Sequence, residues 1–219
     1  MIELNQIINA DCMDIMRDIP DKYFELAIVD PPYGINVCKM GLGKGGGLYR
    51  GDKKYKIGDW DNLTPDKIYF DELFRISQNQ IIWGGNYFIE FLTSSSGWIF
   101  WDKNNGGSDF ADGELAWTCF DKPLRKFKFT WSGMIQENMG NLKETKIHPT
   151  QKPIALYRWI LQHYAKPGDK IIDTHSGSGS CAIACHLEKF HFLAIEKDVD
   201  YWKASVERYN TEINQGKPF

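Results

Sequence analysis

A short apolar run followed by a proline-rich turn constrains the fold of this chain more than any other feature. The run covers residues 26–29 (LAIV), and the turn covers residues 30–33 (DPPY). A short continuous apolar run bounded by a turn is typical of a strand buried on both faces, as in a parallel sheet. Open α/β sheets bind their ligands at the carboxyl ends of such strands. The pattern therefore predicts a ligand site at residues 30–33.

The chemistry of this turn suits a planar group that carries an NH₂. Pro31 and Pro32 fix φ and donate no backbone N–H, which makes the turn stiff and leaves its carbonyl oxygens free. The Asp30 carboxylate and the Pro31 carbonyl can accept the two N–H bonds of an exocyclic amine, and Tyr33 can stack on the attached ring. A nucleobase fits this description. The plainer alternative is a proline-rich loop that only ends a strand.

A strand, a glycine turn and a helix are predicted in the last quarter of the chain. Residues 170–173 (KIID) read as the strand, residues 174–180 (THSGSGS) as the turn, and residues 181–185 (CAIAC) as the start of the helix. Glycines allow the backbone to approach a ligand closely. The next apolar run ends in Glu196, and an acid about 20 residues after a glycine turn holds a ribose hydroxyl in nucleotide-binding folds.

Two other nucleotide-binding patterns fit less well. Residues 41–47 (GLGKGGG) contain a lysine, but no Ser or Thr follows it and no apolar strand precedes it, so they read as a flexible loop. A nicotinamide-dependent dehydrogenase would carry its glycine fingerprint after an early first strand, whereas the glycine turn of this chain comes late.

In this order, the motifs resemble those of the S-adenosylmethionine-dependent amino-methyltransferases of DNA, in the permuted arrangement called the β class. Two further segments are similar to family elements, residues 9–12 (NADC) and residues 148–153 (HPTQKP), and the resemblance covers most of the chain. It implies an α/β fold with a single Rossmann-like methyltransferase domain over residues 1–219. Such a domain has a mostly parallel sheet with helices on both faces.

The resemblance also implies S-adenosylmethionine as the cofactor. In the family, the acid of the NADC-like segment approaches the adenine of the cofactor, and the HPTQKP-like segment helps to hold the methionine end. The glycine turn departs from the usual family pattern, because Thr174 and His175 replace a proline and a phenylalanine. The cofactor-binding residues implied are Asp11, Cys12, Asp30, His148, Thr150, Gln151, Lys152, Asp173, His175, Ser176, Gly177, Ser178, Gly179, Glu196 and Lys197.

The reaction implied is methyl transfer to an exocyclic amine of a flipped-out base, with Asp30, Pro31, Pro32 and Tyr33 as the catalytic residues. In the family, Asp at the first motif position indicates adenine N6 and Ser indicates cytosine N4. A site-specific adenine-N6 DNA methyltransferase is therefore the preferred prediction. Cytosine N4 stays an alternative, since both amines suit the acceptor pair. A catalytically inactive DNA-binding subunit is a further alternative, as are RNA methylation and protein-glutamine methylation.

Basic residues suggest two places for contact with double-stranded DNA. Residues 34–58 read as a flexible, basic, glycine-rich loop, and residues 125–131 alternate as a strand with one polar face. Residues 119–147 are the stretch left for a short target-recognition element. A solvated loop and a plain exposed strand face are the alternative interpretations. The DNA-binding residues predicted are Lys39, Lys44, Arg50, Lys53, Lys54, Arg125, Lys126 and Lys128.

The middle of the chain predicts the rest of the sheet. Residues 80–85 read as a strand that ends in a glycine pair, and residues 98–103 read as a strand followed by polar residues. Residues 112–117 lead into another strand, and residues 68–76 have helical spacing. The apolar positions of that helix are Ile68, Phe70, Leu73, Phe74 and Ile76. In related enzymes these segments shape the base pocket, although aromatic residues in strands more often belong to the core. The candidates for the base pocket are Trp83, Asn86, Trp101, Asp102 and Lys103.

Composition limits the class of protein. The 219 residues are enough for one α/β domain, and the net charge of −3 does not suit a protein that coats DNA passively. No apolar run approaches the roughly 18 residues of a membrane span. The five scattered cysteines predict no metal site. The N-terminus lacks a signal sequence, which predicts a cytoplasmic location in a bacterial or virus-infected bacterial cell. The resemblance adds a homodimer and a cognate restriction nuclease as partners to be tested.

Overall fold

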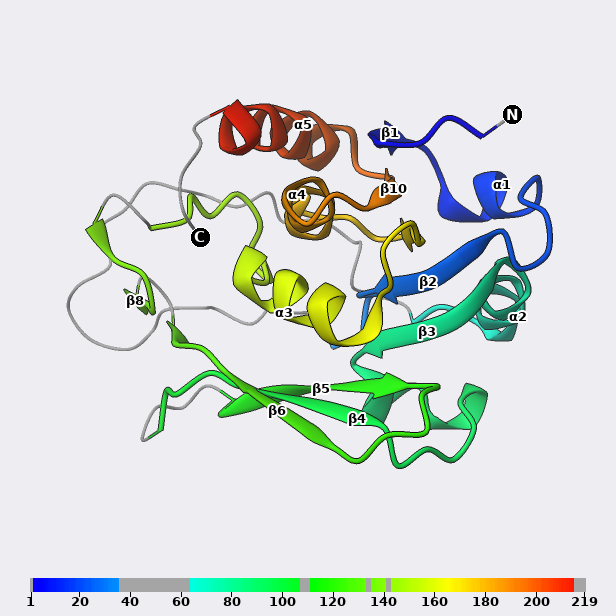
Figure 1. The fold of residues 1–219 in the computed structure, drawn as a ribbon, viewed down its shortest axis with the longest axis horizontal. Coiled ribbons are helices and arrows are strands. Elements are labelled where there is room, and N and C mark those ends of the chain that lie inside the picture. The colour runs from blue at the N-terminus through cyan, green and yellow to red at the C-terminus, as the bar shows by residue number, and fades with distance from the viewer. Residues whose placement is uncertain (1, 36–63, 107–110, 133–134, 141–142, 215–219) are drawn as a thin grey trace.

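Figure 1 shows the fold in a computed structural model, which describes residues 2–35, 64–106, 111–132, 135–140 and 143–214. Within these ranges, one eight-stranded sheet has the order β1-β10-β9-β2-β3-β5-β4-β6. The strands from β1 to β3 in that order are parallel, β5 is antiparallel to both of its neighbours, and β6 is parallel to β4. The strands are β1 (Gln6–Asn9), β2 (Phe24–Val29), β3 (Ser77–Trp83), β4 (Trp98–Asp102), β5 (Gly113–Thr118), β6 (Arg125–Lys128), β9 (Lys170–Asp173) and β10 (His191–Glu196).

Helices cover both faces of this sheet (Figure 1). Helices α3, α4 and α5 lie on one face, and α1 and α2 lie on the other. The helices are α1 (Cys12–Met16), α2 (Lys67–Ile76), α3 (Ile154–Tyr164), α4 (Ser180–Leu187) and α5 (Val199–Asn214), with short 3₁₀ turns η1 (Gly85–Tyr87) and η2 (Ile89–Phe91). The predicted α/β architecture is confirmed. None of the helices in the described ranges is long and apolar enough to cross a membrane.

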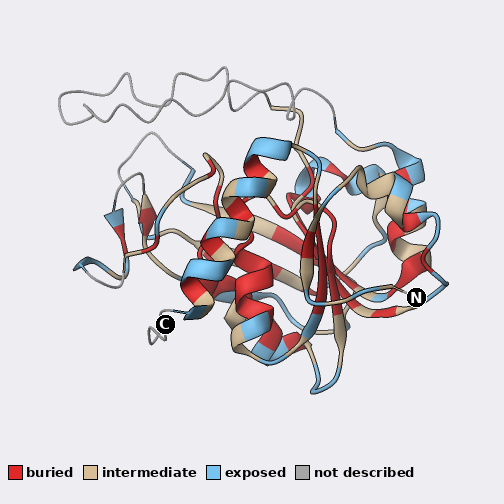
Figure 2. Cartoon of the chain, turned by 90° about the horizontal axis from the view of Figure 1, so that it is seen from above, coloured by how far each residue is buried: buried red, intermediate tan, exposed pale blue. Residues whose placement is uncertain are grey.

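The central strands are apolar along their whole length because both of their faces are buried. In β2, Leu26 and Ile28 pack into the core under α3 and α4, whereas Ala27 and Val29 pack into the core under α2. Figure 2 shows the strands of the sheet as buried between helices whose outer faces are exposed. Burying a side chain of this size stabilises the fold by about 1.5–3 kcal/mol. The turn that follows such a strand lies at the carboxyl edge of the sheet, where open α/β sheets bind their ligands.

Helix α2 begins and ends where its sequence dictates. The Asp66 carboxylate caps it by accepting a hydrogen bond from the Tyr69 backbone N–H at 3.2 Å. Ser77 ends it in an extended conformation and passes the chain directly into β3. The helix predicted over residues 68–76 is therefore present, but Ile68 is 61 % exposed and Tyr69 is buried instead. The start of α2 consequently directs Tyr69 toward the sheet edge.

The strand predicted over residues 125–131 is shorter than expected, so this prediction was wrong in its length. Strand β6 ends at Lys128, and Trp131 begins β7 (Trp131–Ser132), which pairs with β8 (Ile135–Gln136) in a separate hairpin. Trp131 is 6 % exposed, and its indole N–H donates to the Gln151 carbonyl at 2.8 Å. The backbone still follows β4 beyond the end of β6, because the Phe129 N–H donates to the Asp102 carbonyl at 3.0 Å and the Trp131 N–H donates to the Lys103 carbonyl at 3.2 Å.

Candidate active site

A cavity of about 750 Å³ lies at the carboxyl ends of the parallel strands. Its walls are the turns that follow β1, β2 and β9, the end of β10, the segment before α3 and the start of α2. This volume lies within the range of cavities that hold small ligands and cofactors. Most of the predicted cofactor residues line it together with Pro32, one of the residues predicted to be catalytic. These lining residues are Asp11, Cys12, Asp30, Pro32, His148, Thr150, Gln151, Lys152, His175, Ser176, Gly177, Ser178, Glu196 and Lys197.

The glycine turn between β9 and α4 forms one wall of the cavity. Gly177 and Gly179 have φ of 51° and 74°, in the left-handed region that favours glycine. A side chain at Gly179 would press on Ile7 and Ser205, so this glycine allows α4 to start close to β1 and α5. Gly179 itself lies behind the cavity wall, and its backbone N–H donates to the Ser176 carbonyl at 2.8 Å.

The acid predicted to hold a ribose hydroxyl is fixed at the edge of this turn. The Gly177 backbone N–H donates to Oε2 of Glu196 at 2.8 Å, and the Asp198 N–H donates to Oε1 at 2.8 Å. Each oxygen keeps a further lone pair, because an ionised carboxylate offers about four acceptor sites. Glu196 can therefore accept hydrogen bonds from a ligand without breaking those that fix its position.

Two polar groups, the Ser176 hydroxyl and the Asp173 carboxyl, are buried beside the glycine turn. The Ser176 hydroxyl is buried and has no hydrogen-bond partner within the described residues. Asp173 is 4 % exposed, and burial, with the nearby charges of Asp30 and Glu196, raises the pKa of its carboxyl to about 8. A positively charged ligand would favour the ionised form of Asp173. These groups fit a ligand that carries both hydrogen-bonding groups and a positive charge.

The His175 ring occupies the position where the family has an aromatic residue. Its Nδ1 lies 3.0 Å from the Thr174 hydroxyl, which in turn lies 2.8 Å from the hydroxyl of Tyr69. The rings of Tyr69 and His175 meet edge to face, with their centres 5.3 Å apart. Burial lowers the pKa of His175 to about 4, so the ring is neutral at pH 7. Tyr69 and Thr174 line the cavity but were not predicted.

Two further contacts close the cavity on the cofactor side. Lys197 pairs with Asp11 at 2.7 Å, and this ion pair lowers the pKa of Asp11. The His148 ring packs on the Tyr201 ring with their centres 4.3 Å apart, and burial lowers the pKa of His148 to about 4. The residues of the NADC-like and HPTQKP-like segments thus face the same cavity as the glycine turn.

The turn at residues 30–33, predicted to be catalytic, places a carboxylate in the same cavity. The Tyr33 hydroxyl donates to Oδ1 of Asp30 at 2.6 Å, and the Lys152 ammonium donates to Oδ2 at 2.5 Å. Burial raises the pKa of Asp30, and the positive charge of Lys152 opposes that rise. Lys152, predicted as a residue for the methionine end of the cofactor, therefore also contacts the carboxylate that is predicted to be catalytic.

Tyr33 lies beside the cavity and does not form part of its lining. Its ring stacks on the Tyr87 ring, with centres 5.0 Å apart and an angle of 13° between the planes. Gly84, with φ of 67°, lies so close that a side chain there would collide with the Tyr33 ring. The glycine after β3 therefore makes room for the aromatic ring of the turn at residues 30–33.

The remaining predicted residues divide into four groups. Trp83 and Trp101 are 0 % and 1 % exposed and belong to the core, so their side chains are not free to line a base pocket. Asn86 is exposed, and Asp102 and Lys103 are partly buried at the end of β4. Arg125, Lys126 and Lys128 are exposed on β6, the edge strand of the sheet. Outside the described residues lie Lys39, Lys44, Arg50, Lys53, Lys54 and nearly all of the basic loop at 34–58.

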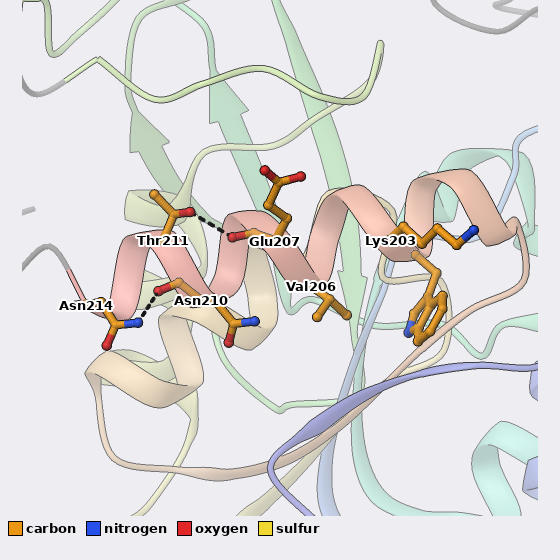
Figure 3. Close-up of a pocket in the computed structure, with 7 residues that line it drawn as sticks. Lys203, Val206, Glu207, Asn210, Thr211 and Asn214 are labelled. Carbon is orange, nitrogen blue, oxygen red and sulfur yellow. Dashed lines mark hydrogen bonds between the residues drawn. The ribbon is translucent and has the colours of Figure 1, made fainter.

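A second hollow lies along α5 and is not the functional site (Figure 3). All of its lining residues come from that helix, among them Lys203, Val206 and Glu207. Two of its polar side chains bond within the helix: Thr211 donates to the Glu207 carbonyl at 2.9 Å and Asn214 donates to the Asn210 carbonyl at 2.7 Å. It contains none of the predicted catalytic or cofactor residues.

Comparison with known proteins shows which families and relatives this chain is similar to. Residues 120–207 match the N6_N4_Mtase family model, which describes a DNA methylase. The chain is 23 % identical to the Type II methyltransferase M.HinfI of Haemophilus influenzae, over 94 % of this chain and 68 % of that protein. The resemblance to DNA amino-methyltransferases is thus confirmed.

Solved structures agree on the fold. The M1.HpyAVI–SAM complex superimposes with a TM-score of 0.59 and 20 % identity, over 93 % of this chain and 98 % of that one. The cytosine-N4-specific PvuII DNA methyltransferase gives a TM-score of 0.59 at 14 % identity, over 95 % of this chain and 92 % of that one. The fold of this chain is therefore the fold of DNA methyltransferases, and the relatives include an enzyme that is specific for cytosine N4.

Proposed function

We propose that this chain is an S-adenosylmethionine-dependent DNA methyltransferase that transfers a methyl group to adenine N6 of a flipped-out base. One observation carries the proposal. The catalytic turn and the glycine turn, about 140 residues apart in the sequence, open into one cavity through Asp30 and Ser176. An amine acceptor and a nucleotide-type site are thereby in one place, as a group-transfer enzyme requires.

The residues of the cavity fit the cofactor. Glu196 has acceptor capacity for ribose hydroxyls, and the Ser176 hydroxyl lacks a partner within the described residues. Asp173 is buried behind the cavity lining, next to Thr174, and a cationic ligand in the cavity would favour its ionised form. When bound, S-adenosylmethionine supplies an electrophilic methyl group on a positively charged sulfur. A nucleotide-like ligand with a cationic end thus matches both the hydroxyl acceptors and the buried acid.

The catalytic turn would act on the amine of the base. The Asp30 carboxylate and the Pro31 carbonyl would accept its two N–H bonds and hold its lone pair toward the methyl group. As the amine is methylated it gains positive charge, which these oxygens would stabilise. Asp30 is already fixed from two sides, by Tyr33 at 2.6 Å and by Lys152 at 2.5 Å, so little reorganisation is needed.

The choice between the two amines rests on the residue at the first motif position. Asp30 favours adenine N6 through the resemblance to the family, in which Ser at this position indicates cytosine N4. Cytosine N4 is the second candidate, because the PvuII DNA methyltransferase, which has a similar fold, is specific for cytosine N4. The acceptor pair suits either amine, so the base must be measured.

Double-stranded DNA is the proposed partner, contacted on the side of β6 and the β7–β8 hairpin. Arg125, Lys126 and Lys128 provide exposed positive charge for phosphates. Ile135 and Met139 are 60 % and 56 % exposed in the segment proposed for target recognition, residues 119–147. Exposed apolar side chains beside basic ones are suited to a nucleic acid whose base has left the stack. A second copy of the chain and a cognate nuclease are further partners to be tested.

Mass spectrometry of nucleosides tests the function directly. The chain would be expressed in a host that lacks DNA methylation, and the host DNA would be digested and analysed. N6-methyladenine would support the proposal as stated. N4-methylcytosine would keep the reaction and reject the choice of base. Neither product, from folded protein that binds S-adenosylmethionine, would reject DNA methylation and favour RNA or an inactive subunit.

A further inference from the structure

A chain of four alternating charges links Lys103, Glu114, Lys152 and the Asp30 carboxylate. The Lys152 ammonium pairs with Asp30 at 2.5 Å and with Oε2 of Glu114 at 2.9 Å. Lys103 pairs with the other oxygen of Glu114, Oε1, at 2.5 Å. The four residues come from four separate segments: the turn after β2, the segment before α3, the start of β5 and the end of β4.

Stability alone gives a poor reason for this network. Removing charges from water costs several kcal/mol per ion, and apolar residues of similar volume often serve a fold as well or better. The Lys152 side chain is 2 % exposed, and those of Asp30 and Glu114 are 20 % and 24 % exposed. Asp30 and Lys152 line the cavity, whereas Glu114 and Lys103 lie behind them. The network therefore ends at the carboxylate that is proposed to bind the amine.

The contacts of Asp30 leave room for an amine and fix the direction of the acceptor. Tyr33 uses one lone pair of Oδ1 and Lys152 uses one of Oδ2, so each oxygen keeps a lone pair for the base. A protonated carboxyl would present a donor in place of one acceptor. Lys152 thus acts on both requirements, the orientation of Asp30 and its ionised state.

Glu114 has the corresponding role toward Lys152. A lysine with only one carboxylate partner could turn its ammonium toward the cavity, where it would repel a cationic ligand. Glu114 holds the ammonium from the opposite side, and Lys103 offsets the charge of Glu114. Burial works against the charge on Glu114, yet the two lysines lower its pKa to about 2. Glu114 therefore stays ionised throughout the pH range in which an enzyme would be assayed.

We propose that Lys152 is a positioning residue for methyl transfer: its ammonium, clamped by Glu114, orients the Asp30 carboxylate and keeps it ionised. This inference rests on the proposed function only for its catalytic consequence. The coupling between the two residues is a property of the protein without substrate. It departs from the role that the family resemblance implied for Lys152, which was to hold the methionine end of the cofactor.

The charged and titratable neighbours of the pair determine the expected pH dependence. Asp30 faces Lys152, Glu114 and Tyr33, with Asp173 on β9, Tyr69 on α2 and Tyr157 on α3 nearby; Lys152 also faces His148. Lys152 lowers the pKa of Asp30, and Glu114 raises it. Removing the charge of Lys152 should therefore raise the pKa of Asp30, and removing that of Glu114 should lower it.

The test compares Lys152→Met, Lys152→Arg and Glu114→Gln with the unchanged chain, and uses Lys166→Met, an exposed lysine, as the control. The pKa of Asp30 would be measured by NMR of the protein labelled with ¹³C at aspartate carboxyls, with Asp30→Asn for assignment. We expect an upward shift of about one unit or more in Lys152→Met, a downward shift in Glu114→Gln, and a value near the original in Lys152→Arg. A purely structural role for the network would not move the two variants in opposite directions.

Single-turnover methylation of DNA measures the effect of the same variants on the rate of methyl transfer. Lys152→Met should slow methyl transfer about 100-fold at pH 7 and move the acid limb of the rate to higher pH, while isothermal titration shows little change in S-adenosylmethionine affinity. Lost cofactor affinity with an unmoved Asp30 pKa would overturn the proposal. If Lys152→Met does not fold, the pKa of Asp30 in Glu114→Gln and in Lys152→Arg tests the proposal instead. NMR shifts as expected in a chain that methylates no DNA would reject the proposed function and keep the coupling.

Discussion

Arg208 of α5 donates from Nη1 to the backbone carbonyl of Ser178 at 2.8 Å, and so ties the last helix to the glycine turn of the cavity. The same guanidinium reaches the Ser180 hydroxyl at 3.0 Å and Oε2 of Glu144 at 2.7 Å. Arg208 and Glu144 are 4 % and 8 % exposed. The other Glu144 oxygen accepts the Ile154 N–H at 2.9 Å, which begins α3. One buried pair thus connects the glycine turn with α3 and α5.

Replacing Arg208 by methionine should destabilise the fold and loosen the glycine turn. The change leaves the Glu144 carboxylate buried without its cation, and breaking such a pair costs about 3–5 kcal/mol. Denaturant unfolding would measure the loss, and isothermal titration would measure the expected fall in affinity for S-adenosylmethionine. Arg17→Ala is the control, since the Arg17 side chain is 67 % exposed and pairs with the exposed Asp14 at 3.5 Å. Unchanged affinity in a folded Arg208 variant would contradict the link to the glycine turn.

Asp30→Ala should abolish methyl transfer and leave cofactor binding intact. The change removes the proposed acceptor for the amine, whereas Glu196 and Ser176, which are proposed to bind the cofactor, belong to other segments of the cavity lining. Methyl transfer from labelled cofactor to DNA and isothermal titration with S-adenosylmethionine would measure the two properties separately. Asp14→Ala, an exposed carboxylate of α1, should change neither. Full activity of Asp30→Ala would refute the proposed mechanism.

The raised pKa of Asp173 predicts that the affinity for S-adenosylmethionine increases as the pH rises. Its folded-state pKa of about 8 lies above the ordinary 3.8, so the buried carboxyl is mostly neutral at pH 7 without a ligand. A cationic ligand favours its ionised form, so binding near pH 7 should release up to one proton. Titration in buffers with different ionisation enthalpies would count that proton, and Asp173→Asn should abolish the release. Heats that do not depend on the buffer would contradict this prediction.

The same pKa makes a separate prediction about stability. Because the folded value lies above the unfolded one, the stabilisation from neutral Asp173 is complete below about pH 4 and is lost as the pH rises toward 8. Asp173→Asn removes that loss and should raise the stability of the ligand-free protein at pH 7 by about 1–3 kcal/mol. Denaturant unfolding at pH 4 and pH 7 would measure it. A destabilisation that is equal at both pH values would mean that lost hydrogen bonds dominate.

Local motifs allowed much of this site to be predicted from the sequence. Residues 30–33 and 174–180 each follow their own strand, and parallel strands bring such turns to one edge of the sheet. Glu114 could not be found in this way, because β5 is inserted antiparallel between β3 and β4, and that order depends on contacts between distant segments. The aromatic residues Trp83 and Trp101 look the same in sequence whether they line a pocket or fill the core.

Gly84→Ala should impair the catalytic turn although Gly84 carries no functional group. Gly84 has φ of 67°, and a methyl group there would collide with the Tyr33 ring, so both the backbone and the ring must move. Tyr33 would then lose its hydrogen bond to Asp30 or its stacking on Tyr87. We expect a destabilisation of about 1–3 kcal/mol and a fall in methyl transfer larger than any fall in cofactor affinity. Gly106→Ala is the matched control, because a methyl group there meets no atom of the described residues within 4 Å. Equal effects of the two substitutions on methyl transfer would show that the contact between Gly84 and Tyr33 is not needed for catalysis.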